Sequence, residues 1–340
     1  MLTFRRFRAG GVKEDSEVSV HDAVRTRRHA TWAGLAAILL WSTAVALVRS
    51  LSEGLGPVTA GAAVYGVSGG LTLAGLLMNR GRWDQVRRLP RRYLLVCGGL
   101  FVGYVLALYL AIGMADSRQQ VLEVGLLNYL WPCLTLLLTV ALLNKAARLT
   151  LVPATMLALA GVFLVLTPAG DCSWRSFAAN FAGNPVAYLL GLAAAGSWGL
   201  YSVLTRKLAG GHKTGAVELF LPATAVTLLL MCPFVHEPRV WTARACVEAV
   251  ALGLMTVLSY GLWDKAMRGG NMVVVAAVSY LTPFFSTVVS CFYLAVAPEP
   301  RVWVGCGLLI AGSLMSWYSV RETDTGHAAG PAAGKDNTAS

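Results

Sequence analysis

The sequence predicts an all-α membrane protein of ten transmembrane helices, arranged as a 5+5 inverted repeat with the N- and C-termini in the cytoplasm. Three observations predict this fold: the composition, the long apolar stretches, and a match between the two halves of the chain. Of the 340 residues, 56% are hydrophobic and only 13% are charged, whereas a soluble domain carries about 25% charged residues. Such an apolar chain is expected to fold in a lipid bilayer.

Ten stretches are long enough to cross a bilayer, because a spanning helix needs ~20 mainly apolar residues. They cover residues 31–50, 57–79, 93–115, 120–143, 149–168, 185–207, 215–235, 246–267, 271–296 and 301–320. Pro57 and Pro185 stand where two of these stretches begin, a helix position at which the missing N–H of proline costs nothing. Basic clusters and connections containing glycine or proline separate the stretches.

The two halves of the chain match each other. Residues 34–51 read GLAAILLWSTAVALVRSL and residues 191–208 read GLAAAGSWGLYSVLTRKL, which gives eight identities in 18 positions at an offset of 157. A second pair, NYLWP at 128–132 and SYLTP at 279–283, follows in the same order. Because five helices are an odd number, the second half has to start on the opposite side of the membrane. Binding sites in such inverted repeats lie near the midplane, between the halves.

The orientation follows from the lysines and arginines of the connections, which gather on the cytoplasmic side. If the N-terminus is inside, 22 of these residues lie inside and 6 lie outside. The same bias accounts for the net charge of +11, so we expect no nucleic-acid partner.

The expected organisation has five parts. A disordered basic cytoplasmic tail covers 1–30, and a disordered polar tail covers 321–340, because both lack apolar periodicity. The first repeat covers 31–168, an external linker covers 169–184, and the second repeat covers 185–320.

The motifs of enzymes are missing from this sequence. All five histidines lie in tails or connections, and no H-E-x-x-H, G-x-S-x-G or P-loop motif occurs. We therefore expect no catalytic residue, no metal and no cofactor. Cys172, Cys232 and Cys246 fall at or near the outer face, where a disulfide is conceivable, although free thiols are the default expectation.

Aromatic residues deep in the predicted helices are the main candidates for a binding site. Trp41 and Trp198 occupy equivalent positions of the repeat, near the middle of the bilayer. Tryptophan prefers the membrane interface, where its N–H stays hydrated, so a pair at the midplane favours a polar cavity or a ligand over plain packing. Further aromatic candidates for the same site are Tyr104, Trp131, Tyr201, Tyr260 and Trp263.

Two prolines fall within apolar stretches. Pro132 and Pro283 each remove a backbone hydrogen bond and free a carbonyl group, which predicts kinks with a hinge or gating role beside the cavity. Asn128 and Ser279 lie one turn earlier, on about the same face. They are expected either to meet the polar end of a substrate or to belong to a kink without substrate contact.

Acidic residues are scarce in the apolar stretches. Glu123 is the most credible buried acid, and its role is left open between a structural and a functional one. Asp264 and Glu218 lie close to predicted helix ends, which favours a helix-terminal role for both.

The ten stretches, the inverted repeat, the paired tryptophans and the proline-bearing helices resemble the drug/metabolite transporter superfamily, with two EamA-type domains over 31–320. GLLNYLWPCLT and SYLTPFFST are similar to the aromatic amino-acid exporters of that superfamily. This resemblance implies a basket-like cavity that opens outward, with the fifth and tenth helices peripheral. It also implies export of aromatic and other neutral amino acids across the bacterial inner membrane.

We therefore expect a multi-pass inner-membrane transporter that exports aromatic amino acids by alternating access, with amino acids and the lipid bilayer as its partners. The alternatives are a broad-specificity metabolite or drug exporter of the same superfamily, a channel-like pore and, least favoured, a membrane enzyme. No assembly motif is present, so a monomer or weak oligomer is expected.

Overall fold

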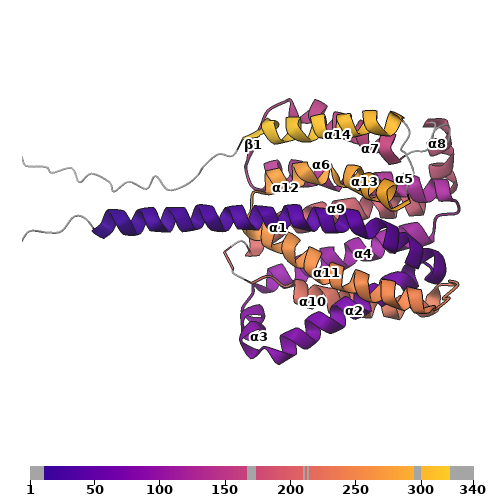
Figure 1. The fold of residues 1–340 in the computed structure, drawn as a ribbon, viewed down its shortest axis with the longest axis horizontal. Coiled ribbons are helices and arrows are strands. Elements are labelled where there is room, and N and C mark those ends of the chain that lie inside the picture. Colours follow the sequence, from indigo (N-terminus) through magenta and orange to yellow (C-terminus); the bar gives the residue numbers. More distant parts are fainter. Residues whose placement is uncertain (1–10, 167–173, 210, 213, 295–299, 322–340) are drawn as a thin grey trace, which may run out of the picture.

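The computed structural model describes residues 11–166, 174–209, 211–212, 214–294 and 300–321. It is a bundle of helices from which α1 extends at one end (Figure 1). The helices of the first half are α1 (Gly11–Leu55), α2 (Pro57–Met78), α3 (Arg80–Arg87), the π-helical turn η1 (Tyr93–Cys97), α4 (Gly98–Gly113), α5 (Arg118–Asn128), α6 (Trp131–Leu142) and α7 (Leu151–Leu166). Those that follow are α8 (Trp174–Gly183), α9 (Pro185–Ala209), α10 (Val217–Met231), the 3₁₀ turn η2 (Cys232–Phe234), α11 (Ala243–Gly269), α12 (Met272–Ser279), α13 (Thr282–Leu294) and α14 (Pro300–Ser319).

The prediction of an all-α membrane protein is confirmed. Seven helical segments of the described part are long and apolar enough to cross a membrane. Of the remaining predicted stretches, one lies within α1, one corresponds to the shorter apolar helix α7, and one is divided between α12 and α13. In the described ranges, β structure is limited to β1 (Ala146–Ala147), which pairs antiparallel with β2 (Val320–Arg321).

Helices also cover parts of two segments that lie outside the ten predicted stretches. The expectation of disorder over 1–30 is wrong for residues 11–30, because α1 begins at Gly11 and runs without interruption into the apolar stretch. A polar segment attached to an existing helix avoids the cost of nucleation, which explains how it extends the helix. The predicted linker 169–184 contains α8, while residues 1–10, 167–173 and 322–340 lie outside the described part.

The cysteines of the described residues were expected to be free thiols, and those named here are free. Cys232 and Cys246 are free thiols, as are the buried Cys97 and Cys133. Cys172 lies outside the described residues.

The main helix pairs each join one half of the chain to the other. α1 packs along α11, α4 along α9, α2 along α10, and α7 along α14. In Figure 1, α7 and α14 lie on one side of the bundle and α2 and α10 on the opposite side, with α9 between them. The largest buried apolar cluster draws its residues from α1, α2, α4, α9, α10 and α11, so it lies between the halves.

Glycines bring the backbones of α7 and α14 into direct contact. A Cβ added at Gly312 would lie 2.5 Å from the Ala158 nitrogen, and one at Gly161 would lie 2.7 Å from the Gly305 oxygen. Small residues allow helices to approach this closely in a membrane. The close packing of α7 against α14 therefore depends on the missing side chains of these glycines.

The start of α2 is fixed by a residue far away in the sequence. Gly56 has a φ of 82° and Pro57 is the first residue of the helix, a combination that suits a turn into a helix. The carboxylate of Glu237 accepts hydrogen bonds from the backbone N–H groups of Val58 and Thr59, both at 2.7 Å. A carboxylate here satisfies orphan N–H groups and complements the helix dipole.

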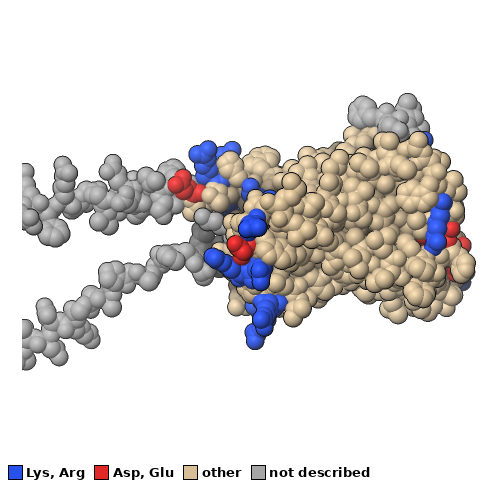
Figure 2. All heavy atoms as spheres, turned by 90° about the horizontal axis from the view of Figure 1, so that it is seen from below, with Lys and Arg blue, Asp and Glu red and all other residues tan. Residues whose placement is uncertain are grey.

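The surface divides into charged ends and an uncharged belt. Lys and Arg gather at the end from which α1 extends, and the middle of the face shown in Figure 2 carries almost no charge. We call this end the basic end; it includes the exposed side chains of Arg28, Arg80, Arg87 and Arg88. Large apolar side chains such as Trp303, 54% exposed, lie on the outside of the belt, as expected of a surface in contact with lipid.

Candidate functional site

Four indole rings from four helices meet at the centre of the bundle. Trp41 comes from α1, Trp131 from α6, Trp198 from α9 and Trp263 from α11. The centroids of all six ring pairs lie between 5.1 and 6.5 Å apart. We call these four residues the tryptophan cluster; each half of the chain contributes two of them.

Tyrosines and a phenylalanine surround the tryptophan cluster. The ring of Tyr104 lies 4.8 Å from that of Trp198, with Tyr201 at 5.1 Å and Tyr260 at 5.6 Å. The structure thus brings together all seven aromatic residues that the sequence singles out. Phe101 and Tyr65 belong to the same group but are not in the predicted set. Phe101 lies 4.9 Å from the ring of Tyr260, and the Tyr65 and Tyr260 hydroxyls are 2.9 Å apart.

A weak signal in the sequence points to Phe101. It precedes Tyr104 by three residues, so both lie on one face of α4. No comparable signal exists for Tyr65, whose place is set by the packing of α2.

The rings of the group differ in burial. Trp263 is fully buried and Trp198 is 2% exposed, whereas Trp41 and Tyr104 are partly exposed. The polar atoms deep in the group are satisfied only in part: the Trp263 indole N–H donates to the Ser202 hydroxyl at 3.2 Å, whereas the Tyr201 hydroxyl is buried without a hydrogen-bond partner among the described residues.

Both proline-bearing stretches are interrupted at equivalent places. α5 ends at Asn128 and α6 begins at Trp131, with Pro132 as its second residue. α12 ends at Ser279 and α13 begins at Thr282, with Pro283 second. The breaks lie where the prolines remove backbone donors. Whether they act as hinges stays a prediction.

The two polar residues at these breaks differ in their hydrogen bonds. The Ser279 hydroxyl is buried and donates to the Ala276 carbonyl at 2.6 Å. The Asn128 side-chain oxygen is buried without a hydrogen-bond partner in the described part of the chain. A buried unpaired amide oxygen costs free energy. Asn128 is therefore the better candidate to accept a hydrogen bond from a ligand.

Glu123 is buried, as predicted, but its oxygens are occupied. The carboxylate accepts hydrogen bonds from Gln119 at 3.0 Å, from Asn180 at 3.2 Å and from the Tyr188 hydroxyl. These donors belong to α5, α8 and α9, which places Glu123 in a polar junction between helices. α5 and α8 lie at the end of the bundle opposite the basic end (Figure 1).

Comparison with known proteins decides the family. The model of the EamA-like transporter family matches residues 29–167 and again residues 185–318. The chain belongs to the EamA-like transporter family. The two matched segments coincide with the two halves described above.

Named relatives of this EamA-like transporter cover nearly the whole chain. It is similar to proteins named "Aromatic amino acid exporter YddG" from Salmonella typhimurium, at 35% identity, and from Escherichia coli, at 33% identity, in both cases over 87% of this chain and 99% of the relative. The protein of that name from Ancylobacter novellus is 32% identical over the same shares. A solved crystal structure superposes with a TM-score of 0.69 at 30% identity, covering 84% of this chain and 96% of that one.

The resemblance drawn from the sequence is thus confirmed at the level of the family. The protein is a membrane transporter, a multi-pass protein of the bacterial inner membrane that handles a small-molecule substrate.

Proposed function

We propose that this EamA-like transporter exports aromatic amino acids across the inner membrane, and that the substrate side chain binds at the tryptophan cluster. The observation that carries the proposal is the meeting of four indole rings, two from each half, at the centre of the bundle. Aromatic rings in contact gain about 0.5–1.5 kcal/mol beyond the burial of area. The names of the relatives support the same substrate class.

The polar end of the amino acid needs a partner of its own. We assign the ammonium group to the Asn128 side-chain oxygen, which is buried and unpaired. Ser279 lies at the equivalent break and contributes less, because its hydroxyl already donates to the backbone. Neutral amino acids with smaller side chains would bind more weakly, since they lose the ring contacts.

We further propose that the ten helices form an inverted repeat that works by alternating access, with the basic end in the cytoplasm. The packing supports this, because a two-fold exchange of the halves converts the α1–α11 pair into the α9–α4 pair and leaves α2–α10 and α7–α14 as they are. The arginines of the basic end support the orientation. Pro132 and Pro283 would flex as the halves rock.

Flux in proteoliposomes that contain only this protein tests the proposal. Labelled phenylalanine should show saturable flux, and unlabelled tryptophan and tyrosine should compete. Competition by aromatic cations that lack a carboxylate, as strong as that by amino acids, would instead favour a broad-specificity exporter. Flux that does not saturate would indicate a channel-like pore, and a lack of flux from folded protein would contradict the amino-acid assignment.

A further inference from the structure

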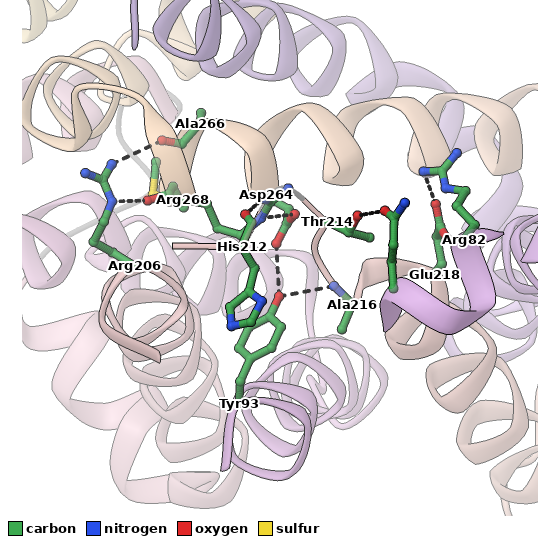
Figure 3. Close-up of polar contacts among 12 residues, drawn as sticks. Arg82, Tyr93, Arg206, His212, Thr214, Ala216, Glu218, Asp264, Ala266 and Arg268 are labelled. Atoms are coloured by element: carbon green, nitrogen blue, oxygen red, sulfur yellow. Dashed lines mark hydrogen bonds and ion pairs between the residues drawn. The ribbon is translucent and has the colours of Figure 1, made fainter. Parts of the chain in front are cut away.

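A buried carboxylate lies near the basic end of α11. Asp264 is 3% exposed, and its Oδ2 is 2.8 Å from the Arg268 Nε, one helical turn further on. Its Oδ1 accepts a hydrogen bond from the Tyr93 hydroxyl at 3.1 Å (Figure 3). Asp264 thus has two partners, one on its own helix and one from the first half of the chain.

The described residues between α9 and α10 close over this carboxylate. The Ala216 backbone N–H donates to the Tyr93 hydroxyl at 3.2 Å, and Arg268 donates to the His212 carbonyl at 2.7 Å. A Cβ added at Gly215 would lie 1.9 Å from Asp264 Oδ2. Only glycine allows the backbone to approach the carboxylate so closely.

A second set of contacts joins the same connection to α3. Arg82 forms an ion pair with Glu218 at the start of α10, and the Thr214 hydroxyl donates to Gln85 (Figure 3). Together with Tyr93–Asp264, these contacts cross from the first half to the second half at the basic end. The halves can part here only if these contacts and the Tyr93–Ala216 hydrogen bond break.

The halves can part at the basic end without separating the buried charges of Asp264 and Arg268. The ion pair between Asp264 and Arg268 lies within α11 and moves with that helix, so neither charge loses its partner when the halves part. Opening breaks contacts to the neutral Tyr93 hydroxyl and contacts at the exposed Arg82 and Thr214, which water replaces at modest cost. A buried charge pair divided between the halves would resist opening far more strongly, whereas the Arg82–Glu218 pair that does join them has its arginine side chain 56% exposed to solvent.

A line of side chains on η1 and α4 connects this closure with the tryptophan cluster. Cys97 follows Tyr93 by four residues and is fully buried, and Phe101 follows Cys97 by four and lies 6.1 Å from the Trp198 ring. Tyr93 and Cys97 delimit the π-helical turn η1, a feature that frequently marks functional sites in helices.

We propose that Asp264, Tyr93 and residues 214–216 form the gate of the transport path at the basic end, held closed in this structure. The proposal rests on the alternating access of the proposed function. In the open state, the Tyr93 hydroxyl leaves Asp264, and the substrate passes along Cys97 to the tryptophan cluster.

The accessibility of the Cys97 thiol to a water-soluble reagent measures the opening of this gate, and the assay needs no substrate. The full-length protein in lipid nanodiscs is treated with a charged, water-soluble methanethiosulfonate reagent, and the modification of Cys97 is followed by mass spectrometry of its peptide. Tyr93→Phe removes only the hydroxyl and should accelerate modification by about ten-fold, the effect of losing one hydrogen bond to a charged group. Gly215→Ala should act in the same direction by pushing the connection away from Asp264.

Tyr109→Phe is the matched control, because it makes the same change on the same helix, at a residue whose ring packs near Tyr65. It should leave the modification of Cys97 at the wild-type rate. Wild-type rates in both Tyr93→Phe and Gly215→Ala, or an equal increase in Tyr109→Phe, would overturn the gate. Because the assay needs no amino acid, faster modification in protein that does not transport phenylalanine would support the gate and contradict only the proposed substrate.

Discussion

The indole rings of Trp41 and Trp198 lie 5.6 Å apart and cross at 74°, and the two residues occupy the same position in the two halves of the chain. In the inverted repeat that we propose, equivalent residues meet only if they lie near its two-fold axis. This contact therefore places the centre of the bundle, and the aromatic group around it, between the halves.

The Asn128 side chain should matter for transport and little for stability. Asn128→Leu removes a buried oxygen that has no partner in the described structure, so unfolding should occur at an unchanged or higher temperature. The KM for phenylalanine should rise about ten-fold or more, as for a lost hydrogen bond to a charged group. Ser279→Ala is the control at the equivalent break and should have a smaller effect. Equal effects of the two substitutions would argue against the assignment of the ammonium group.

The glycines of α7 and α14 should tolerate no added methyl group. Gly312→Ala puts a Cβ 2.5 Å from the Ala158 nitrogen, and such overpacking costs about 1–3 kcal/mol. The temperature of unfolding in detergent should fall. Gly307→Ala on the same helix meets nothing within 4 Å and should leave that temperature unchanged or raise it, since alanine favours a helix. A stable Gly312→Ala variant would show that α7 and α14 can separate freely.

Pro132 should be needed for the rate of transport and not for folding. Pro132→Ala supplies the missing N–H and allows α5 and α6 to become continuous. We expect a slower maximal flux of phenylalanine, with thermal stability retained. Pro153→Ala makes the same change at an exposed proline of α7 and should transport like the wild type. A normal maximal rate in Pro132→Ala would remove the hinge role.

The sequence predicts the tryptophan pair because the repeat puts both residues in register. It does not reveal Tyr65, because a single aromatic residue in an apolar helix has the same pattern whether it faces lipid or protein. The helical residues 11–30 are missed for a related reason, since their polar composition is that of a disordered tail and only continuity with α1 makes them helical.

The burial of Asp264 also could not be predicted from the sequence. Its position near a helix end favours a solvated terminal role, yet Tyr93 and the close approach of Gly215 enclose it. Tyr93 lies in the other half of the chain, and Gly215 is far from Asp264 in the sequence. No local sequence pattern predicts contacts between such distant residues.

The most direct test of the tryptophan cluster is the flux of labelled phenylalanine in proteoliposomes made from wild-type, Trp198→Ala and Trp303→Ala protein. Trp198 is buried among the aromatic rings, whereas Trp303 is 54% exposed on the outside of α14. The account predicts that Trp198→Ala lowers flux about ten-fold or more, from the loss of several ring contacts, while Trp303→Ala transports like the wild type. Normal flux in folded Trp198→Ala protein, or equal losses in the two variants, would contradict the claim that the substrate binds at the tryptophan cluster.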